Sequence, residues 1–268
     1  MWRYIEEDNV SASLGLAADE YLVTTFNPPH PNPRPQGERG GSGSGILRLY
    51  TYKSHCALVG RFQDIEKELN LEECKRRGIA VNRRPTGGGA ILMGEDQLGI
   101  AIIAPVGTIH ESPLLQSKAL FETYSKGITF GLRRLGIEVE FRPKNDMLVN
   151  NKKIAGIALF IEDNNNLLFH ASVLLDMDIP LMVSVLNIPQ EKLSGKGINS
   201  ASERITTVSM ELDKKVSMRE LKSVMKLGFQ EILDAEFNHE PFNANEIAAT
   251  KELEERKYQT KDWIFKGS

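Results

Sequence analysis

The sequence predicts an α+β fold with a mostly antiparallel central sheet flanked by helices. Segments with the two-residue alternation of β-strands concentrate between residues 46 and 175, whereas the helical spacing of apolar residues precedes and follows them. The last strands of this stretch follow one another through short turns, which is typical of an antiparallel meander rather than of a doubly wound sheet. We expect a single domain over residues 1–268, because only one predicted helix precedes the longest loop.

The composition is that of an ordinary soluble globular protein. Hydrophobic residues make up 41% of the chain and charged residues 26%, and the formal net charge is −3. This charge gives no general attraction to nucleic acid, and no apolar run is long enough to span a membrane. The two cysteines, Cys56 and Cys74, suggest neither a disulfide framework nor a zinc site, and the acidic N-terminus does not resemble a signal peptide. We therefore expect a cytoplasmic protein that binds neither nucleic acid nor membranes.

The first element is an amphipathic helix over residues 13–26, for which Ser11 or Ser13 is a suitable N-cap. Residues 27–45 are rich in Pro, Gly and Ser and cannot bury enough apolar surface to offset their ordering entropy. We expect this stretch to be a flexible surface loop. A proline-rich ligand for a partner protein is the alternative interpretation.

The remaining elements follow from alternation, helical spacing and glycine stops. Strands are predicted at residues 46–52, 57–60, 79–81, 97–104, 137–141, 147–149, 153–161 and 167–175. Helices are predicted at residues 69–77, 117–135, 179–186, 217–237 and 243–256. The last two helices belong to a helical tail that begins at about residue 209.

The strongest chemical signal is the glycine triplet Gly87-Gly88-Gly89, which follows Arg83 and Arg84. Glycines let a ligand approach the backbone closely, and successive backbone amides can form a concave anion site. The two arginines add positive charge and the geometry to bind phosphate or carboxylate. The spacing matches neither a Walker loop nor a dinucleotide fingerprint. Taken alone, the triplet favours an anion site, with a tight turn beside solvated arginines as the alternative.

Lys153 begins a predicted strand in which Gly156 and Ala158 share one face. Such small residues suit a narrow channel beside a ligand, although they also permit close sheet packing. Upstream, Asn145 and Asp146 form a polar pair that can bind magnesium, orient an amine or cap a turn. Taken alone, a lysine at the end of a strand is usually solvated.

Several motifs, in their order and spacing from about residue 14 to 208, resemble the lipoate–protein ligase A family, which shares its fold with biotin–protein ligases and octanoyltransferases. The matching stretches are Ala18-Asp19-Glu20, Gly60-Arg61-Phe62-Gln63, Arg83 to Ala90, Asn145-Asp146, Lys153-Ile154-Ala155-Gly156, Phe169 to Leu175 and Lys192 to Ser200. The chain departs from the family pattern at Met93 to Asp96, where a His-Asp pair is common, at Ile157, and at Ala171 after His170. The resemblance implies a single catalytic domain of the short form, without the C-terminal accessory domain of the longer ligases.

The resemblance also implies a reaction in two steps. ATP and lipoate or octanoate give an acyl-adenylate, with Mg²⁺ as the metal, and the acyl group then passes to a lysine of a lipoyl carrier domain. Lys153 and Asp146 would be the catalytic residues, and Asp146 would ligate magnesium or align the incoming amine. The nucleotide would contact Arg84, Gly87, Gly88, Gly89, Ala90, Ile91, Leu92, Lys153 and Ile157. Lipoate would contact Gly88, Lys153 and His170.

Three other functions compete with an ATP-dependent ligase. An octanoyl or lipoyl transferase of the same fold needs a thiolate at the acyl site, but neither Cys56 nor Cys74 lies in the stretch 145–172 that is expected to build the pocket. A biotin–protein ligase would use similar chemistry, but the two arginines and the Asn-Asp pair favour lipoate. A non-catalytic subunit is the third alternative. Some shorter members of the family need a separate small protein for the activation step, so we also expect an accessory subunit as a partner.

Overall fold

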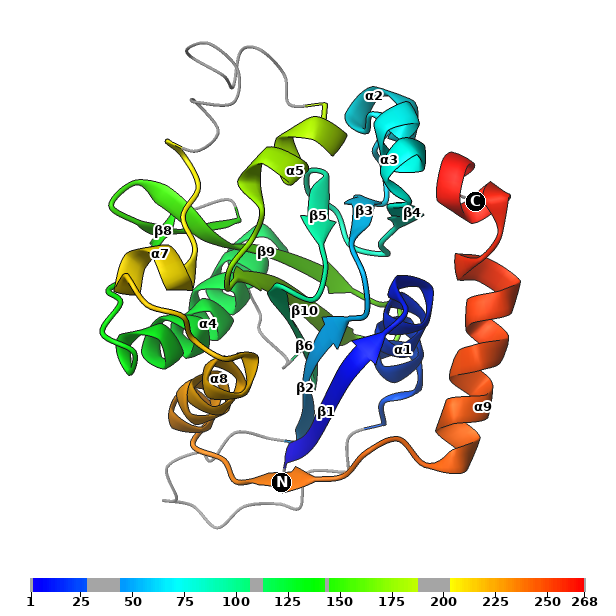
Figure 1. The fold of residues 1–268 in the computed structure, drawn as a ribbon. Helices are drawn as coiled ribbons and strands as arrows, with labels where there is room; N and C mark the ends of the chain where they lie inside the picture. The colour runs from blue at the N-terminus through cyan, green and yellow to red at the C-terminus, as the bar shows by residue number, and fades with distance from the viewer. Residues whose placement is uncertain (1, 28–43, 107–112, 143–144, 188–202, 268) are drawn as a thin grey trace.

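The computed structural model describes residues 2–27, 44–106, 113–142, 145–187 and 203–267, and it confirms the α+β class (Figure 1). The larger of its two sheets has the strand order β11-β1-β2-β6-β10-β9-β8-β7, and five of its seven neighbouring pairs are antiparallel. Its strands are β1 (Trp2–Val10), β2 (Gly45–Tyr52), β6 (Gln97–Pro105), β7 (Glu140–Arg142), β8 (Asp146–Val149), β9 (Lys152–Ile161), β10 (Asn166–Leu174) and β11 (Phe237–His239).

A second, three-stranded sheet has the order β4-β3-β5. Its strands are β3 (Cys56–Val59), β4 (Ala80–Arg83) and β5 (Ile91–Met93). The helices are α1 (Ala12–Thr25), α2 (Ile65–Glu68), α3 (Leu71–Arg77), α4 (Pro113–Arg133), α5 (Ile179–Val185), α7 (Val208–Leu212), α8 (Met218–Leu233) and α9 (Ala244–Leu253), followed by the π-helical turns η2 (Glu254–Tyr258) and η3 (Asp262–Lys266). No helix among the described residues combines the length and the apolar character needed to cross a bilayer.

Helices cover both faces of the large sheet, as Figure 1 shows. On one face α4 and α8 pack together, and the buried side chains of Leu47 and Leu49 join their apolar cluster. On the other face Ile46 and Tyr50 join a cluster that includes α1 and the C-terminal turns. All eight residues of β2 are buried because this strand lies in the interior of a sheet with both faces covered.

The N-terminal strand β1 is the main element that local sequence patterns do not predict. Its acidic residues obscure the alternation in which Trp2 and Tyr4 are buried. The strand pairs in parallel with both β2 and β11, so all of its partners are distant in the sequence. Cations from other elements compensate two of its carboxylates. Glu7 pairs with Arg48 of β2 at 2.7 Å, and Asp8 pairs with Lys222 of α8 at 2.7 Å.

Other differences concern the ends of elements. The predicted helix 217–237 ends at Leu233, because Asp234 adopts a left-handed conformation and the chain continues into β11. The predicted strand 137–141 begins only at Glu140, although Ile137 and Val139 are buried in the core. The N-cap of the first helix is Ser11, whose side chain accepts a hydrogen bond from the backbone of Leu14. Most of the predicted flexible loop, residues 28–43, lies outside the described residues.

The crossing of α4 and α8 gives a first prediction. A Cβ atom on Gly228 would lie 2.2 Å from the carbonyl oxygen of Gly127 and 2.5 Å from the backbone nitrogen of Gly131. Because backbone cannot move aside as a side chain can, we expect Gly228→Ala to lower the free energy of unfolding by about 1–3 kcal/mol, the usual effect of overpacking. Urea unfolding measures it. Leu227→Ala, on the exposed side of the same helix, is the control and should change stability by only about 0.5 kcal/mol. An unchanged unfolding midpoint for Gly228→Ala would refute the prediction.

Candidate active site

A cavity of about 600 Å³ lies between the two sheets. Its walls come from β8, β9 and β10 of the large sheet, from β5 and the glycine loop, and from α5. Every residue that the sequence analysis assigned to the site lines this cavity except Gly87. These residues are Arg84, Gly88, Gly89, Ala90, Ile91, Leu92, Asp146, Lys153, Ile157 and His170. The fold therefore brings together segments that are far apart in the chain.

The glycine loop is held in place by close backbone contact. Gly88 has a φ of 100°, a conformation that side chains rarely adopt. A Cβ atom on Gly60 would lie 2.3 Å from the carbonyl oxygen of Gly88, so the turn after β3 packs directly against the loop. The backbone nitrogen of Arg61 also donates to the carbonyl oxygen of Thr86 at 3.0 Å. Glycine at both Gly60 and Gly88 is thus required by the shape of the loop.

Arg84 folds back on the loop and lines the cavity. Its Nη2 donates to the carbonyl oxygens of Gly87 and Gly89, each at 2.8 Å. Its Nη1 is buried and makes no hydrogen bond to the described residues. Burial without a carboxylate partner lowers the pKa of Arg84 to about 10, so the guanidinium remains charged at neutral pH. A buried cation of this kind is stabilised by an anionic ligand.

The neighbouring Arg83 points away from the cavity, contrary to the expectation that both arginines serve one anion. Arg83 is the last residue of β4 and Arg84 follows it directly, so the alternation of an extended chain sends the two side chains in opposite directions. All three nitrogens of the Arg83 guanidinium donate to backbone carbonyls, which are those of Gly60, Arg61, Gln63, Trp263 and Phe265. In return, the indole of Trp263 donates to the carbonyl oxygen of Arg83 at 2.9 Å. Arg83 thus connects the C-terminal turns to the base of the glycine loop.

Lys153 reaches the cavity and is held beside a carboxylate. Its Nζ lies 2.7 Å from Oδ1 of Asp146, with 32% and 37% of the two side chains exposed. A Cβ atom on Gly156 would lie 3.1 Å from this Nζ, so the small residue in the strand makes room for the lysine. The backbone of Lys153 donates to the carbonyl oxygen of Arg204 at 2.7 Å and accepts from Thr206 at 2.9 Å. These contacts fix the lysine at the edge of the cavity.

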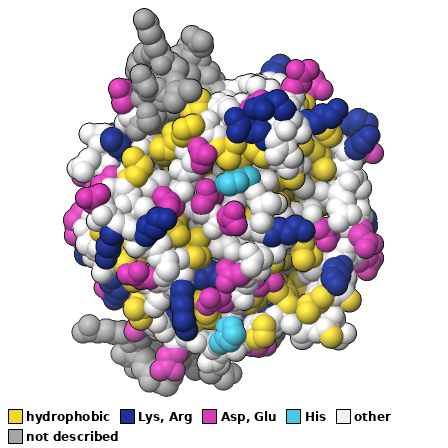
Figure 2. All heavy atoms as spheres, in the orientation of Figure 1, with side chains coloured by type: hydrophobic (Ala, Val, Ile, Leu, Met, Phe, Trp, Pro, Cys, Tyr) yellow, Lys and Arg dark blue, Asp and Glu magenta, His cyan; other side chains and the backbone are white. Residues whose placement is uncertain are grey.

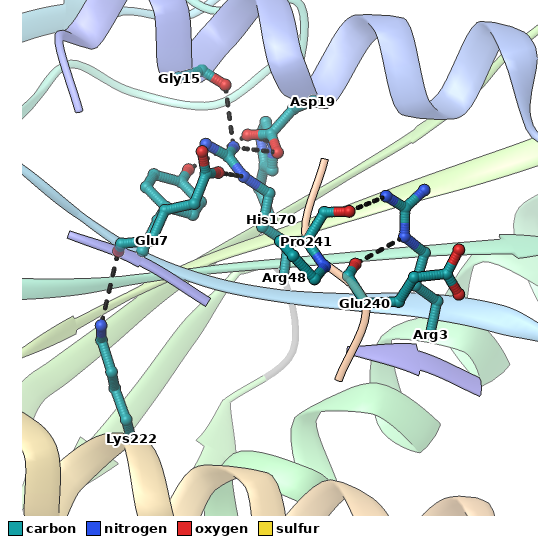
Figure 3. A network of polar contacts seen from close by, with 10 residues as sticks. Arg3, Glu7, Gly15, Asp19, Arg48, His170, Lys222, Glu240 and Pro241 are labelled. Carbon is teal, nitrogen blue, oxygen red and sulfur yellow. Dashed lines mark hydrogen bonds and ion pairs between the residues drawn. The ribbon is translucent and has the colours of Figure 1, made fainter. Parts of the chain in front are cut away.

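His170 connects the cavity to a buried ionic network (Figure 3). Its Nε2 lies 2.9 Å from Oδ2 of Asp19, and Arg48 Nη1 donates to Oδ1 of the same carboxylate at 2.7 Å. Burial disfavours the charged carboxylate, but the charge of Arg48 and the contacts from His170 outweigh it, so the pKa of Asp19 lies below its ordinary value. An ionised Asp19 can only accept a hydrogen bond, so Nε2 of His170 is the donor. In a neutral His170 the other ring nitrogen, Nδ1, is then an acceptor, and it lies 3.4 Å from Oγ1 of Thr86 in the glycine loop.

Charge in the cavity has the opposite sign to that of the whole chain. The charged residues among those that line it are Arg84, Arg142, Lys153, Arg204 and Asp146, a net charge of +3, whereas the chain carries −3. By contrast, acidic and basic side chains are interspersed over the face drawn in Figure 2. Low-dielectric walls strengthen such a local field. The cavity is therefore suited to an anionic ligand.

The described part of the chain offers neither a thiol at the cavity nor a cluster of metal ligands. Both Cys56 and Cys74 are buried outside the cavity lining, and burial raises the pKa of each thiol. Within the described ranges, no three side chains of His, Cys, Asp or Glu gather to hold a metal ion.

Sequence reasoning did not find Arg142 and Arg204, because no local motif marks them. Arg48 gave a weak signal, as the one charged residue in the otherwise uncharged strand 45–52.

Known proteins resemble this chain over nearly its whole length. A family described as the lipoyl protein ligase A/B catalytic domain matches residues 12–230. The octanoyltransferase LipM of Brevibacillus brevis is 26% identical over 287 residues, which cover 98% of each chain. A bi-partite lipoate protein ligase from Thermoplasma acidophilum, described with its E2 lipoyl domain, has a TM-score of 0.81 at 26% identity and covers 99% of this chain and 97% of that one. A crystal structure of lipoate-protein ligase A bound with ATP has a TM-score of 0.79 at 26% identity, with 97% of each chain covered.

The ionic network behind His170 gives the second prediction. Asp19→Asn removes one member of a buried ion pair, so we expect it to lower the free energy of unfolding by roughly 3–5 kcal/mol. It should also shift the tautomer of His170, since an amide can donate to as well as accept from Nε2. Urea unfolding and ¹⁵N NMR of labelled histidine measure the two effects.

The exposed pair of Arg134 and Glu231 provides the control. Arg134→Gln should cost about 1 kcal/mol or less and leave the histidine signal unchanged. Because Asp19→Asn alone can fail to fold, the double variant Asp19→Asn, Arg48→Met removes both charges and should recover part of the lost stability while the tautomer stays shifted. A native tautomer in the double variant would contradict the role given to Asp19.

Proposed function

The chain belongs to the lipoyl protein ligase A/B catalytic-domain family, and we propose that within it this protein is an ATP-dependent lipoate–protein ligase. Residues 1–268 would form one catalytic domain. It would join lipoate or octanoate to AMP and then transfer the acyl group to a lysine of a lipoyl carrier domain. The observation that carries the proposal is the cationic cavity, in which the buried Nη1 of Arg84 makes no hydrogen bond to the described residues.

Similarity to an octanoyltransferase makes acyl transfer without ATP the main alternative. A transferase that forms a thioester on the enzyme needs a reactive thiolate at the acyl site. The whole sequence contains two cysteines, and both are buried, have raised pKa values and lie outside the cavity lining. The excess of cations in the cavity instead suits a nucleotide phosphate, and the similar ligase structure holds ATP. These observations favour the adenylate route.

In the first step an oxygen of the fatty-acid carboxylate would bond to the α-phosphorus of ATP, and the bond from that phosphorus to its bridging oxygen would break. Lys153 and Arg84, which line the cavity, would stabilise the negative charge on the α-phosphate, and the amides beside Gly88 would contact it. In the second step the amine of the carrier lysine would attack the acyl carbonyl and AMP would leave. This step depends mainly on positioning, which needs no covalent enzyme intermediate.

Asp146 would serve this second step by aligning the incoming amine. It is the one carboxylate among the described residues that line the cavity, and it already contacts Lys153. A magnesium ion would therefore bind mainly through the ATP phosphates, with Asp146 as its protein ligand, and would neutralise phosphate charge. His170 would contact the acyl group from the opposite wall, with its ring held by Asp19.

The acceptor would be a protein with a lipoyl domain, such as the E2 domain described with the similar ligase from T. acidophilum. That ligase is bi-partite. We extend this property to the present chain and propose that a separate accessory subunit takes part in the activation step. Formation of lipoyl-adenylate by the purified chain alone, from lipoate and ATP, would exclude such a requirement.

A third prediction separates ligase from transferase. The double variant Cys56→Ser, Cys74→Ser should keep its ATP-dependent activity within about twofold, because no thiol takes part. The assay incubates the protein, together with a candidate accessory subunit, with ATP, magnesium, lipoate and a lipoyl carrier domain, and weighs the carrier by mass spectrometry. Loss of all acyl transfer in a folded double variant, or full activity of the wild type without ATP, would support a transferase.

The fourth prediction concerns Lys153. Lys153→Ala should reduce adenylate formation by roughly 100-fold or more, the usual effect of removing one donor that stabilises developing charge. Lys152→Ala is the matched control, since Lys152 precedes Lys153 in β9 but does not line the cavity. Pyrophosphate release in the presence of the candidate accessory subunit measures the rate, and circular dichroism checks the fold. Equal rates for the two variants would show that Lys153 is not catalytic.

A further inference from the structure

We propose that Arg142 and Arg204 form a subsite for the pyrophosphate group, holding the β- and γ-phosphates of ATP and then the leaving pyrophosphate. The inference rests on the proposed function, because it assumes a nucleotide triphosphate in the cavity. It assigns a role to two arginines that lie outside the motifs of the sequence analysis.

Backbone pairing holds both arginines next to Lys153 and Asp146. Arg142 ends β7 directly opposite Asp146 of β8. Its Nη2 donates to Oδ1 of Asn151 at 3.1 Å, which directs the side chain toward the turn between β8 and β9. The carbonyl oxygen of Arg204 accepts from the backbone of Lys153, so this arginine lies alongside the first residues of β9. Arg142 and Arg204 therefore approach Lys153 from two different segments.

Exposure increases from the inner wall of the cavity to its opening. Arg84 is buried, Lys153 is about one-third exposed, and Arg142 and Arg204 are exposed. If Lys153 contacts the α-phosphate, the rest of the triphosphate extends toward the two exposed arginines. A leaving group must depart to solvent, and exposed cations can stabilise it without trapping it.

The charge balance leads to the same assignment. Arg84, Lys153 and Asp146 together contribute a net charge of +1, and a bound Mg²⁺ would add two positive charges, which together are fewer than the negative charges of a triphosphate and a fatty-acid carboxylate. Arg142 and Arg204 raise the net charge of the cavity lining to +3. Their guanidinium groups also have the planar donor geometry that binds phosphate in a bidentate manner. An acidic surface of the carrier domain is the other possible partner for exposed arginines, but the position of both beside Lys153, in the wall of the cavity, favours phosphate.

The subsite would act in the first step of the reaction. When the bond between the α-phosphorus and the bridging oxygen breaks, its electron pair passes to that oxygen, which leaves as part of pyrophosphate. The new charge develops on the side of the α-phosphate that faces the opening. Arg142 and Arg204 would stabilise this charge, whereas Arg84 would remain with the adenylate.

The test compares the affinities of ATP, inorganic pyrophosphate and AMP by isothermal titration calorimetry. In the double variant Arg142→Gln, Arg204→Gln, ATP and pyrophosphate should each bind roughly tenfold or more weakly, because charge-assisted hydrogen bonds are lost. AMP lacks these phosphates, so its affinity should change by less than about twofold. Arg133→Gln, Arg134→Gln is the matched control: it makes the same change in net charge on exposed arginines of α4 and just after it, and all three affinities should stay the same.

Each other outcome is decisive. Unchanged affinity for ATP and pyrophosphate in the double variant refutes the subsite. A higher KM for the carrier domain with unchanged ATP binding also refutes it and assigns the arginines to carrier docking. An equal loss of affinity for AMP would show a general effect of charge and would likewise overturn it. If the wild type binds pyrophosphate through these arginines but forms no adenylate even together with the accessory subunit, the subsite stands and the proposed function fails. If the wild type binds neither ATP nor pyrophosphate, both proposals fail.

Discussion

Arg48 and Asp19 form an ion pair from which water is fully excluded, and several elements that build the cavity meet at it. Arg48 comes from β2 and also contacts Glu7 of β1, while Asp19 comes from α1 and contacts His170 of β10. Desolvating two charges is costly, so such a pair persists only when its geometry and remaining hydrogen bonds are well satisfied. Because Arg48 lies in β2 and Asp19 in α1, the need to keep this pair intact fixes α1 against the large sheet. It thereby also fixes the histidine wall of the cavity relative to the glycine loop.

The three arginines 48, 83 and 84 show how the partners of a buried cation decide its role. Arg48 has carboxylates, and Arg83 has a set of backbone carbonyls that includes two from the C-terminal turns. Groups of the protein thus stabilise both cations, which act on its structure, although Nη2 of Arg48 makes no hydrogen bond to the described residues. Arg84 binds carbonyls of its own loop through Nε and Nη2 only, so Nη1 is left for a ligand. The distinction lies in the surroundings of each guanidinium and not in the residue type.

Local patterns in the sequence predicted most of the fold, because alternation and helical spacing report burial directly. They did not reveal β1, whose carboxylates are compensated by Arg48 and Lys222 from distant segments. The candidate site was predicted where motifs are continuous, as in the glycine triplet and the strand that begins near Lys153. Which of Arg83 and Arg84 faces the cavity follows from the placement of β4 against the C-terminal turns, and the positions of Arg142 and Arg204 depend on sheet pairing. Contacts between residues so distant in the sequence leave no local pattern from which they could be predicted.

The same fold serves ligases and transferases, so the choice between them depends on what the cavity offers to the acyl group. A thioester route places the covalent bond on the protein and needs a thiol whose pKa is low. An adenylate route places the reactive bond on the nucleotide, and the protein needs only cations where phosphate charge develops. Here burial raises the pKa of both thiols outside the cavity, while cations line it. The adenylate route that we propose for this chain thus rests on the cations of the cavity and on the position of both thiols outside its described lining.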